Sequence, residues 1–182
     1  AKDNAFPHTP LFLKYVLLLG AILYSAVYVV IAFYRLPYPY ELHWMEGGAV
    51  DHVRRILSGH QLYSEPSLEF TASEYTPFYF YVSALVSKVF GVGLFPLRLV
   101  SFLSSIGCAI IIYKFVRRAT TSSFCGVLAA CLYIATFKIS GASFDIARVD
   151  SLFMLFLLGS IYVLRFAKDV KSYIIAAILM SF

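Results

Sequence analysis

The sequence predicts an all-α transmembrane protein, a polytopic helix bundle with an amphipathic juxtamembrane helix in its first outer loop. Of the 182 residues, 60% are hydrophobic and only 14% are charged, whereas a soluble domain has roughly 45–50% apolar and about 25% charged residues. The mean hydropathy is +0.79. The apolar residues also gather in long runs, and a chain of this length has too little interior to hide them from water.

The length of each apolar run decides whether it is predicted to cross the membrane. A spanning helix needs about 20 mainly apolar residues, because nothing else in the hydrocarbon satisfies its backbone groups. The predicted spans are residues 11–34, 97–116, 122–140, 151–167 and 172–182. Because the last of these stops at about half the required length, we treat residues 1–182 as one transmembrane module and expect it to be the N-terminal piece of a longer protein.

Residues 77–90 are apolar but short, and two topologies depend on them. If this segment crosses the membrane, the two basic connections face outward while Lys2 and Lys14 stay inside. If it lies in the interface or re-enters, the N-terminus and both basic connections are cytoplasmic together. Short basic connections favour the cytoplasm, so we prefer the second arrangement. The basic connections contain Lys114, Arg117, Arg118, Arg165, Lys168 and Lys171.

The preferred arrangement places residues 35–76 and 141–150 on the same, non-cytoplasmic side. Within the first of these loops, residues 48–57 have the period of an amphipathic helix. We expect this helix to lie on the membrane surface with its apolar side toward the lipid. Its apolar side contains Ala49, Val50, Val53, Ile56 and Leu57, and its polar side contains Asp51, His52, Arg54 and Arg55.

Several classes of function find no support in the sequence. The net charge of +5 comes from basic residues at segment ends rather than on one polar face, so no nucleic-acid partner is expected. The three cysteines and the histidines of the first outer loop have no metal-ligand spacing. No GxSxG, Walker or CxxC motif occurs. We therefore expect no cofactor and no protein-held metal from these patterns, and dependence on a divalent ion stays open.

Charged side chains at a membrane boundary are costly and often functional. Glu46 precedes the amphipathic helix, where an acid either caps the helix through its dipole or takes part in catalysis. Asp145, Arg148 and Asp150 form a second set, for which local pairing and capping of the next span are the alternative. Arg98 begins a predicted span, where a guanidinium either binds a phosphate or reaches the lipid headgroups.

Aromatic residues also gather near the proposed interface. A membrane-interface belt is the ordinary explanation for such a cluster, and stacking against a sugar is the functional one. The belt is the explanation that we prefer on sequence alone. The cluster contains Tyr38, Tyr40, Trp44, Tyr75, Phe78, Tyr79 and Tyr81.

Short motifs in a fixed order resemble a known family. They are Trp44-Met45-Glu46-Gly47, Leu57-Ser58-Gly59-His60-Gln61-Leu62-Tyr63, Glu74-Tyr75-Thr76-Pro77-Phe78-Tyr79, Phe95-Pro96-Leu97-Arg98-Leu99-Val100-Ser101 and Ala147-Arg148-Val149-Asp150-Ser151-Leu152. In this order they resemble the N-terminal module of polytopic GT-C class glycosyltransferases, in the group of protein mannosyltransferases and aminoarabinose transferases. The resemblance covers nearly all of residues 10–182.

The resemblance implies transfer of a sugar from a polyprenyl-phosphate donor to an acceptor on the outer face of the membrane. Glu46 matches the acid of the first outer loop, which acts in the family as general base or positions the acceptor. Many relatives carry two adjacent acids there, whereas this chain has Met45 before Glu46. By the same resemblance Arg98 would hold the donor phosphate, Asp150 would shape the pocket, and Arg148 and Tyr75 are further candidate substrate-binding residues.

The expected location is a bacterial cell membrane, with the N-terminus in the cytoplasm. The expected partners are the lipid-linked sugar and membrane lipids, and, for a scaffold, other membrane subunits. A non-catalytic membrane scaffold subunit with a GT-C-like fold is the main alternative to the enzyme. A transporter is less well supported, because the predicted spans place no acid or arginine at mid-depth. If Glu46 is catalytic, Glu46→Gln is expected to abolish transfer and leave folding intact.

Overall fold

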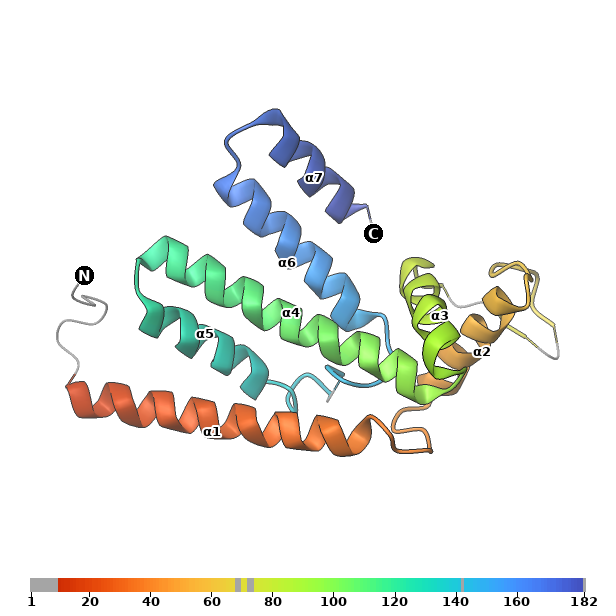
Figure 1. Cartoon of the computed structure of the whole chain (residues 1–182), viewed down its shortest axis with the longest axis horizontal. Coiled ribbons are helices and arrows are strands. Elements are labelled where there is room, and N and C mark those ends of the chain that lie inside the picture. The colour runs from red at the N-terminus through yellow and green to blue at the C-terminus, as the bar shows by residue number, and fades with distance from the viewer. Residues whose placement is uncertain (1–9, 68–69, 72–73, 142, 182) are drawn as a thin grey trace.

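The chain is helical throughout the part that the computed structural model describes, which is residues 10–67, 70–71, 74–141 and 143–181. Within these residues there are seven helices and no strand (Figure 1), which confirms the all-α prediction. The helices are α1 (Leu11–Arg35), α2 (Met45–Leu57), α3 (Phe78–Phe90), α4 (Leu94–Thr120), α5 (Ser123–Ala135), α6 (Asp150–Phe166) and α7 (Val170–Met180). Lys2 lies outside the described residues.

Five helices lie side by side in the spatial order α1, α5, α4, α6 and α7, and the other two gather at one end of this bundle (Figure 1). Helices α1 and α5 run toward the end that carries α2 and α3, while α4 and α6 start from it. We call this the α2–α3 end. At the opposite end lie the start of α1 and the α4–α5 and α6–α7 connections, which contain the clustered lysines and arginines. We call it the basic end.

This arrangement bears on the two topologies considered above. Because α3 packs against α2 and the start of α4, it does not run the length of the bundle, and the start of α1 lies at the same end as both basic connections. Helices α1 and α4 are long and apolar enough to cross a bilayer, and α3, α5 and α7 are shorter apolar helices. The start of α1 and both basic connections therefore share one end of the bundle, and the side of a membrane that this end faces stays a prediction.

Several helices differ in length from the predicted spans. Helix α4 begins at Leu94 instead of 97, because Pro96 fits the first turn, where a missing N–H costs no hydrogen bond. Helix α2 begins at Met45 instead of 48, which places Glu46 in its first turn. Helix α5 ends at Ala135 instead of 140, and the chain then folds back over α4.

The connection from α5 to α6 is held to α4 by serine hydroxyls. Ser105 donates to the carbonyl of Phe144 at 2.6 Å and lies 3.1 Å from the Ser151 hydroxyl. Ser101 donates to the carbonyl of Arg148 at 3.1 Å. These bonds satisfy backbone groups that the loop leaves unpaired, and they fix residues 144–151 beside the first half of α4.

The apolar side of α2 packs on protein rather than on lipid, which corrects the expectation from its sequence. Ala49, Val50 and Val53 are buried in one core cluster with residues of α3, α4 and α6. His52, assigned to the polar side from the sequence, is also buried, and its ring stacks on Phe80 with centroids 4.6 Å apart. His60, which follows the end of α2, is exposed.

Candidate functional site

The α2–α3 end contains a fully buried ion pair between Glu46 and Arg98, both of which are 0% exposed. The Nε of Arg98 donates to Oε1 of Glu46 at 2.9 Å, and its Nη2 donates to Oε2 at 2.7 Å. This two-point geometry between a planar guanidinium and a carboxylate is the strong form of an ion pair. It joins α2 to α4 across 52 positions of the chain.

The segment between α1 and α2 supplies the remaining acceptors for Arg98. Its Nη1 donates to the carbonyls of Arg35 and Tyr38 at 2.8 and 2.6 Å, and its Nη2 to that of Tyr40 at 2.7 Å. Prolines at 37 and 39 have no N–H and prevent the helix from continuing, so these carbonyls are left to bind the arginine. With the two bonds to Glu46, all five N–H groups of the guanidinium are used.

The carboxylate of Glu46 is equally saturated. The backbone N–H of Leu42 donates to Oε2 at 2.6 Å, and that of Ala147 donates to Oε1 at 2.8 Å. Burial alone would raise the pKa of Glu46, but the hydrogen bonds from Arg98, Ala147 and Leu42 favour the charged form more strongly and leave the pKa lowered. The charged form of Glu46 is therefore favoured, and both carboxylate oxygens are buried and hydrogen-bonded in this structure.

A pocket of about 190 Å³ lies beside the pair, between the start of α2, the start of α3 and residues 147–149. Its walls are mostly apolar and carry five aromatic rings. Among the residues that the structure describes, no carboxylate lines this pocket. The lining residues are Trp44, Met45, Gly48, Ala49, His52, Thr71, Tyr75, Tyr79, Phe80, Ala147, Arg148 and Val149.

The ion pair and the pocket share two walls. Met45 lines the pocket while its neighbour Glu46 points into the protein, and Ala147 lines the pocket while its N–H binds Glu46. Removing the carboxylate would release the loop at Ala147 and the start of α2 together. The Glu46–Arg98 pair is thus placed to set the shape of the pocket without facing its interior.

The remaining predicted site residues lie at the pocket or next to it. Tyr75 and Arg148 line it, and Tyr75 is 37% exposed. Asp150 is the first residue of α6 and pairs with Arg148, with Oδ2 at 2.8 Å from Nε. Its side chain is 45% exposed. The structure therefore brings all five predicted residues to one end of the bundle, but it places Glu46 and Arg98 beneath the pocket instead of at an aqueous rim.

Two further residues line this end that were not among the predicted site residues, His52 from the polar side of α2 and Trp44 from the aromatic cluster. His52 lines the pocket, and its position three residues after Ala49 could have indicated the apolar side of α2. Trp44 lines the pocket with 79% of its surface exposed, a position that suits stacking against a ligand. No group of three or more His, Cys, Asp or Glu residues that could hold a metal occurs in the described ranges.

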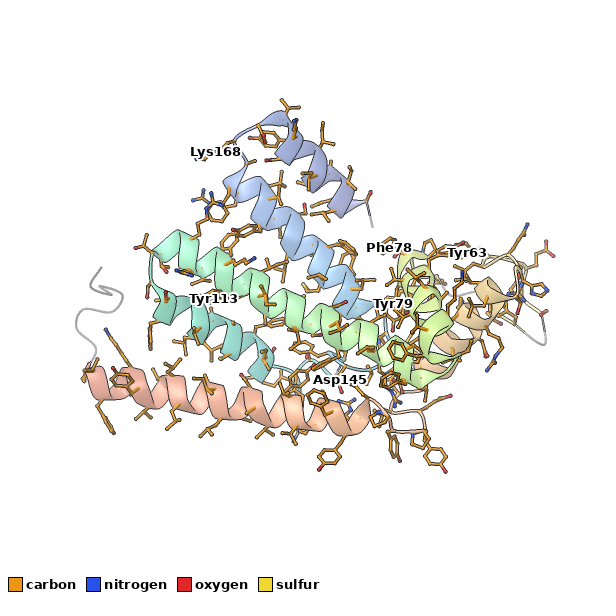
Figure 2. All side chains as sticks on the ribbon, viewed as in Figure 1. Tyr63, Phe78, Tyr79, Tyr113, Asp145 and Lys168 are labelled. Atoms are coloured by element: carbon orange, nitrogen blue, oxygen red, sulfur yellow. The ribbon has the colours of Figure 1, made fainter. Side chains whose placement is uncertain are left out.

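A second buried acid, Asp145, lies between α1 and α4 near the same end (Figure 2). Arg35 donates to its Oδ1 at 2.9 Å, and Asp145 is fully buried, whereas the Arg35 side chain is 18% exposed. Its other oxygen, Oδ2, has no hydrogen-bond partner among the described residues. Burial raises the pKa of Asp145 to about 6, in spite of the opposing charge of Arg35.

The raised pKa of Asp145 predicts a pH-dependent stability. The folded chain binds this proton at a higher pH than the unfolded chain does, so the contribution of Asp145 to stability rises as the pH falls from 7 toward 4 and is lost as the pH rises through 6. As the pH falls through this range, we expect the contribution of Asp145 to the free energy of unfolding to increase by an amount on the order of 1–3 kcal/mol. The difference in thermal unfolding midpoint between wild type and Asp145→Asn, measured in detergent at pH 7.5 and 5, reports it. The same difference at both pH values would contradict the prediction.

The comparison between pH 7.5 and 5 isolates the titration of Asp145. The pKa of Glu46 is lowered, so its carboxylate contributes stability that is lost only at a pH below its ordinary range near 4.5. Asp145→Asn removes one titration and leaves the histidines in place. The two variants therefore differ in one titrating group between pH 5 and 7.5.

A comparison with protein families matches the part of the chain from α3 onward. The family model for dolichyl-phosphate-mannose-protein mannosyltransferase matches residues 74–182. The match covers α3 to α7 and includes Tyr75, Arg98, Arg148 and Asp150, whereas Glu46 and the rest of α2 lie before it. No curated protein and no solved structure matches the chain.

Proposed function

Because the chain belongs to the dolichyl-phosphate-mannose-protein mannosyltransferase family, a family of membrane glycosyltransferases of the GT-C class, we propose that it transfers a sugar from a polyprenyl-phosphate donor to an acceptor on the non-cytoplasmic face. The observation that carries the proposal is the pocket at the α2–α3 end. It is built from residues inside and before the matched region, and three segments distant in sequence converge on it.

The proposed orientation follows from the two ends of the bundle. The basic end carries both lysine- and arginine-rich connections and would face the cytoplasm. The pocket would then lie near the opposite membrane surface, where a polyprenyl phosphate presents its sugar. In this proposal α6 crosses the membrane together with α1 and α4, α5 and the residues after it return the chain toward the pocket, and α7 begins a further span, so the chain is multi-pass. The bacterial location stays a prediction.

Arg148 is the cation that we propose for the donor phosphate. It lines the pocket and its side chain is 24% exposed, whereas all five donors of Arg98 are occupied inside the protein. A partly exposed guanidinium can turn toward a phosphate and stabilise the charge that develops on it as the sugar leaves. Tyr75 and Trp44 would contact the sugar from the opposite wall.

The reaction needs a group that takes a proton from the acceptor. The acceptor hydroxyl oxygen forms a bond to the anomeric carbon, the bond from that carbon to the phosphate oxygen breaks with its electron pair, and polyprenyl phosphate leaves. The hydroxyl proton passes to a carboxylate. Asp150 is nearly half exposed and adjoins the lining residue Val149, so we propose it for this role, in which general-base catalysis contributes about 10²–10⁴-fold.

Glu46 and Arg98 would act on the reaction through position. A catalytic Glu46 needs an oxygen within reach of the acceptor, and both of its oxygens already accept two hydrogen bonds in a closed site. We therefore propose that the pair holds Met45 and Ala147 in the walls of the pocket. The direct roles expected from the family resemblance, base for Glu46 and phosphate ligand for Arg98, stay predictions that require the pair to open.

A non-catalytic membrane subunit with the same fold is the second candidate. It is favoured by the absence of an acid from the pocket lining among the described residues, since Met45 stands where an acid would face the interior. Such a protein would keep the pocket for a lipid or a partner subunit and would have no turnover. One assay separates the two candidates.

The assay uses the purified protein in liposomes with radiolabelled dolichyl-phosphate-mannose and a detergent extract of membranes as the source of acceptor. If the protein is the enzyme, we expect label in an acceptor and an equal amount of released dolichyl phosphate. If the protein is a scaffold, we expect the donor to stay intact and a partner protein to co-purify in a fixed ratio. Loss of the donor's label to water alone, with no acceptor labelled, would show hydrolysis and would count against the proposed transfer.

A further inference from the structure

The basic end carries a concentration of positive charge that the proposed transfer reaction does not use. In residues 111–123 and 161–173 there are six lysines and arginines and one acid, Asp169. Asp169 is engaged as the N-cap of α7, where its Oδ1 accepts from the backbone N–H of Ser172 at 3.0 Å. The cations are exposed, and Figure 2 shows Lys168 on the α6–α7 connection at this end.

Two of these cations come from different helices and lie against the same aromatic ring. Helices α4 and α6 pack along each other, with the rings of Phe115 and Phe166 5.5 Å apart at their C-terminal ends. The Cζ atom of Arg118 lies 4.2 Å from the centroid of Phe166, and that of Arg165 lies 5.5 Å from the same centroid. Two like charges are thus held near one ring by packing between helices.

Neither guanidinium has a carboxylate partner among the described residues. The dipole of a helix favours a cation at its C-terminus, and the positive-inside rule favours cations on this side. Both effects explain basic residues at each helix end. Neither requires that Arg118 and Arg165 lie against the same ring, a placement that brings two like charges into one region, where an anion would offset their repulsion.

We propose that Arg118 and Arg165 form a binding site for the phosphate of an anionic phospholipid of the membrane. Planar guanidinium groups bind phosphate oxygens in pairs, and basic pockets between spanning helices on the cytoplasmic side suit anionic headgroups. Apolar surface for the acyl chains is present beside the site, where Leu164 is 44% exposed and Tyr173 is 54% exposed. The site lies at the opposite end from the pocket and is independent of the sugar transfer.

The test measures binding of short-chain phosphatidylglycerol and phosphatidylcholine to the purified protein in a non-ionic detergent, by native mass spectrometry. Wild type is expected to bind phosphatidylglycerol in preference to phosphatidylcholine. The double variant Arg118→Gln/Arg165→Gln is expected to weaken phosphatidylglycerol binding by about 25-fold, because each basic residue near an anionic surface contributes about fivefold. Both side chains are exposed, so the unfolding midpoint without lipid should not change.

Two control variants distinguish a site from diffuse charge. Arg54→Gln/Lys88→Gln removes the same number of exposed charges at the α2–α3 end and is expected to bind phosphatidylglycerol like wild type. Arg118→Lys/Arg165→Lys keeps the charge and the topology signal but lacks the planar donors, and is expected to bind several-fold more weakly. Equal binding of the two lipids to wild type, equal loss in the two glutamine variants, or undiminished binding by the lysine variant would each overturn the proposal.

Discussion

Replacing Arg98 by methionine is expected to destabilise the protein by about 3–5 kcal/mol, the largest effect on folding that the structure predicts for a single substitution. Methionine fills much of the same space but leaves the Glu46 carboxylate buried without a counter-charge. It also leaves the carbonyls of Tyr38 and Tyr40 without the donor that Arg98 supplies, and that of Arg35 with the backbone N–H of Tyr38 alone. Thermal or denaturant unfolding in detergent measures the loss.

The matched control is Arg54→Met, which breaks an exposed arginine–aspartate pair on α2 with Asp51. Such pairs contribute about 0–1 kcal/mol, so this variant should unfold close to wild type. The double variant Glu46→Gln/Arg98→Met should regain part of the stability lost in Arg98→Met, because it removes the unpaired charge. An Arg98→Met protein as stable as Arg54→Met would contradict the buried pair.

Glu46→Gln tests whether the pair acts through position. Glutamine has one acceptor oxygen where the carboxylate has two, so its amide nitrogen must face a donor from Arg98 or from the backbone of Leu42 or Ala147. We expect a fall in thermal stability together with the loss of transfer, in contrast with the sequence-based expectation that folding stays intact. Full thermal stability with transfer abolished would instead support Glu46 as the base.

Replacing Asp150 by asparagine is expected to lower the rate of sugar transfer by about 10²–10⁴-fold, the largest effect on activity that we predict, because the general base is lost. Folding should change little, since the Arg148–Asp150 pair is partly exposed. The measurement is the initial rate of label transfer from dolichyl-phosphate-mannose in liposomes, normalised to folded protein.

Asp51→Asn is the control for the Asp150 variant. Asp51 is also an exposed acid in a short ion pair with a neighbouring arginine, but it is not among the residues that line the pocket. Its substitution should leave transfer within about twofold of wild type. If Asp150→Asn transferred sugar at the rate of Asp51→Asn, Asp150 would not be the base and the scaffold candidate would gain weight.

Local patterns in the sequence predicted most of the fold. The apolar runs located α1, α4 and α6 to within a few residues, because helix length in a membrane is set by apolar content. The period of residues 48–57 located α2 but not its environment, since an apolar stripe is compatible with lipid or with protein. The apolar side of α2 packs on protein because it shares a core with Tyr79 and Leu97. These contacts depend on tertiary packing.

The candidate site was predicted as a set of residues but not as an arrangement. Glu46, Arg98 and Asp150 were singled out because charge is costly at a membrane boundary, and they do share one end of the bundle. Which of them face the pocket depends on hydrogen bonds over 52 and 101 positions of sequence, to Arg98 and to Ala147. No short-range pattern encodes such contacts, and the same holds for Arg35 and Asp145, which are 110 positions apart.

Photocrosslinking of a bound donor is the most direct test of the central claim, which is that the pocket between α2, α3 and residues 147–149 receives the lipid-linked sugar. The probe is dolichyl-phosphate-mannose with a diazirine on the sugar, and the labelled peptides are identified by mass spectrometry. The account predicts label on peptides containing Trp44, Tyr75 and Arg148, reduced by excess unmodified donor. Label confined to the basic end, or label at the pocket that excess donor does not reduce, would contradict it.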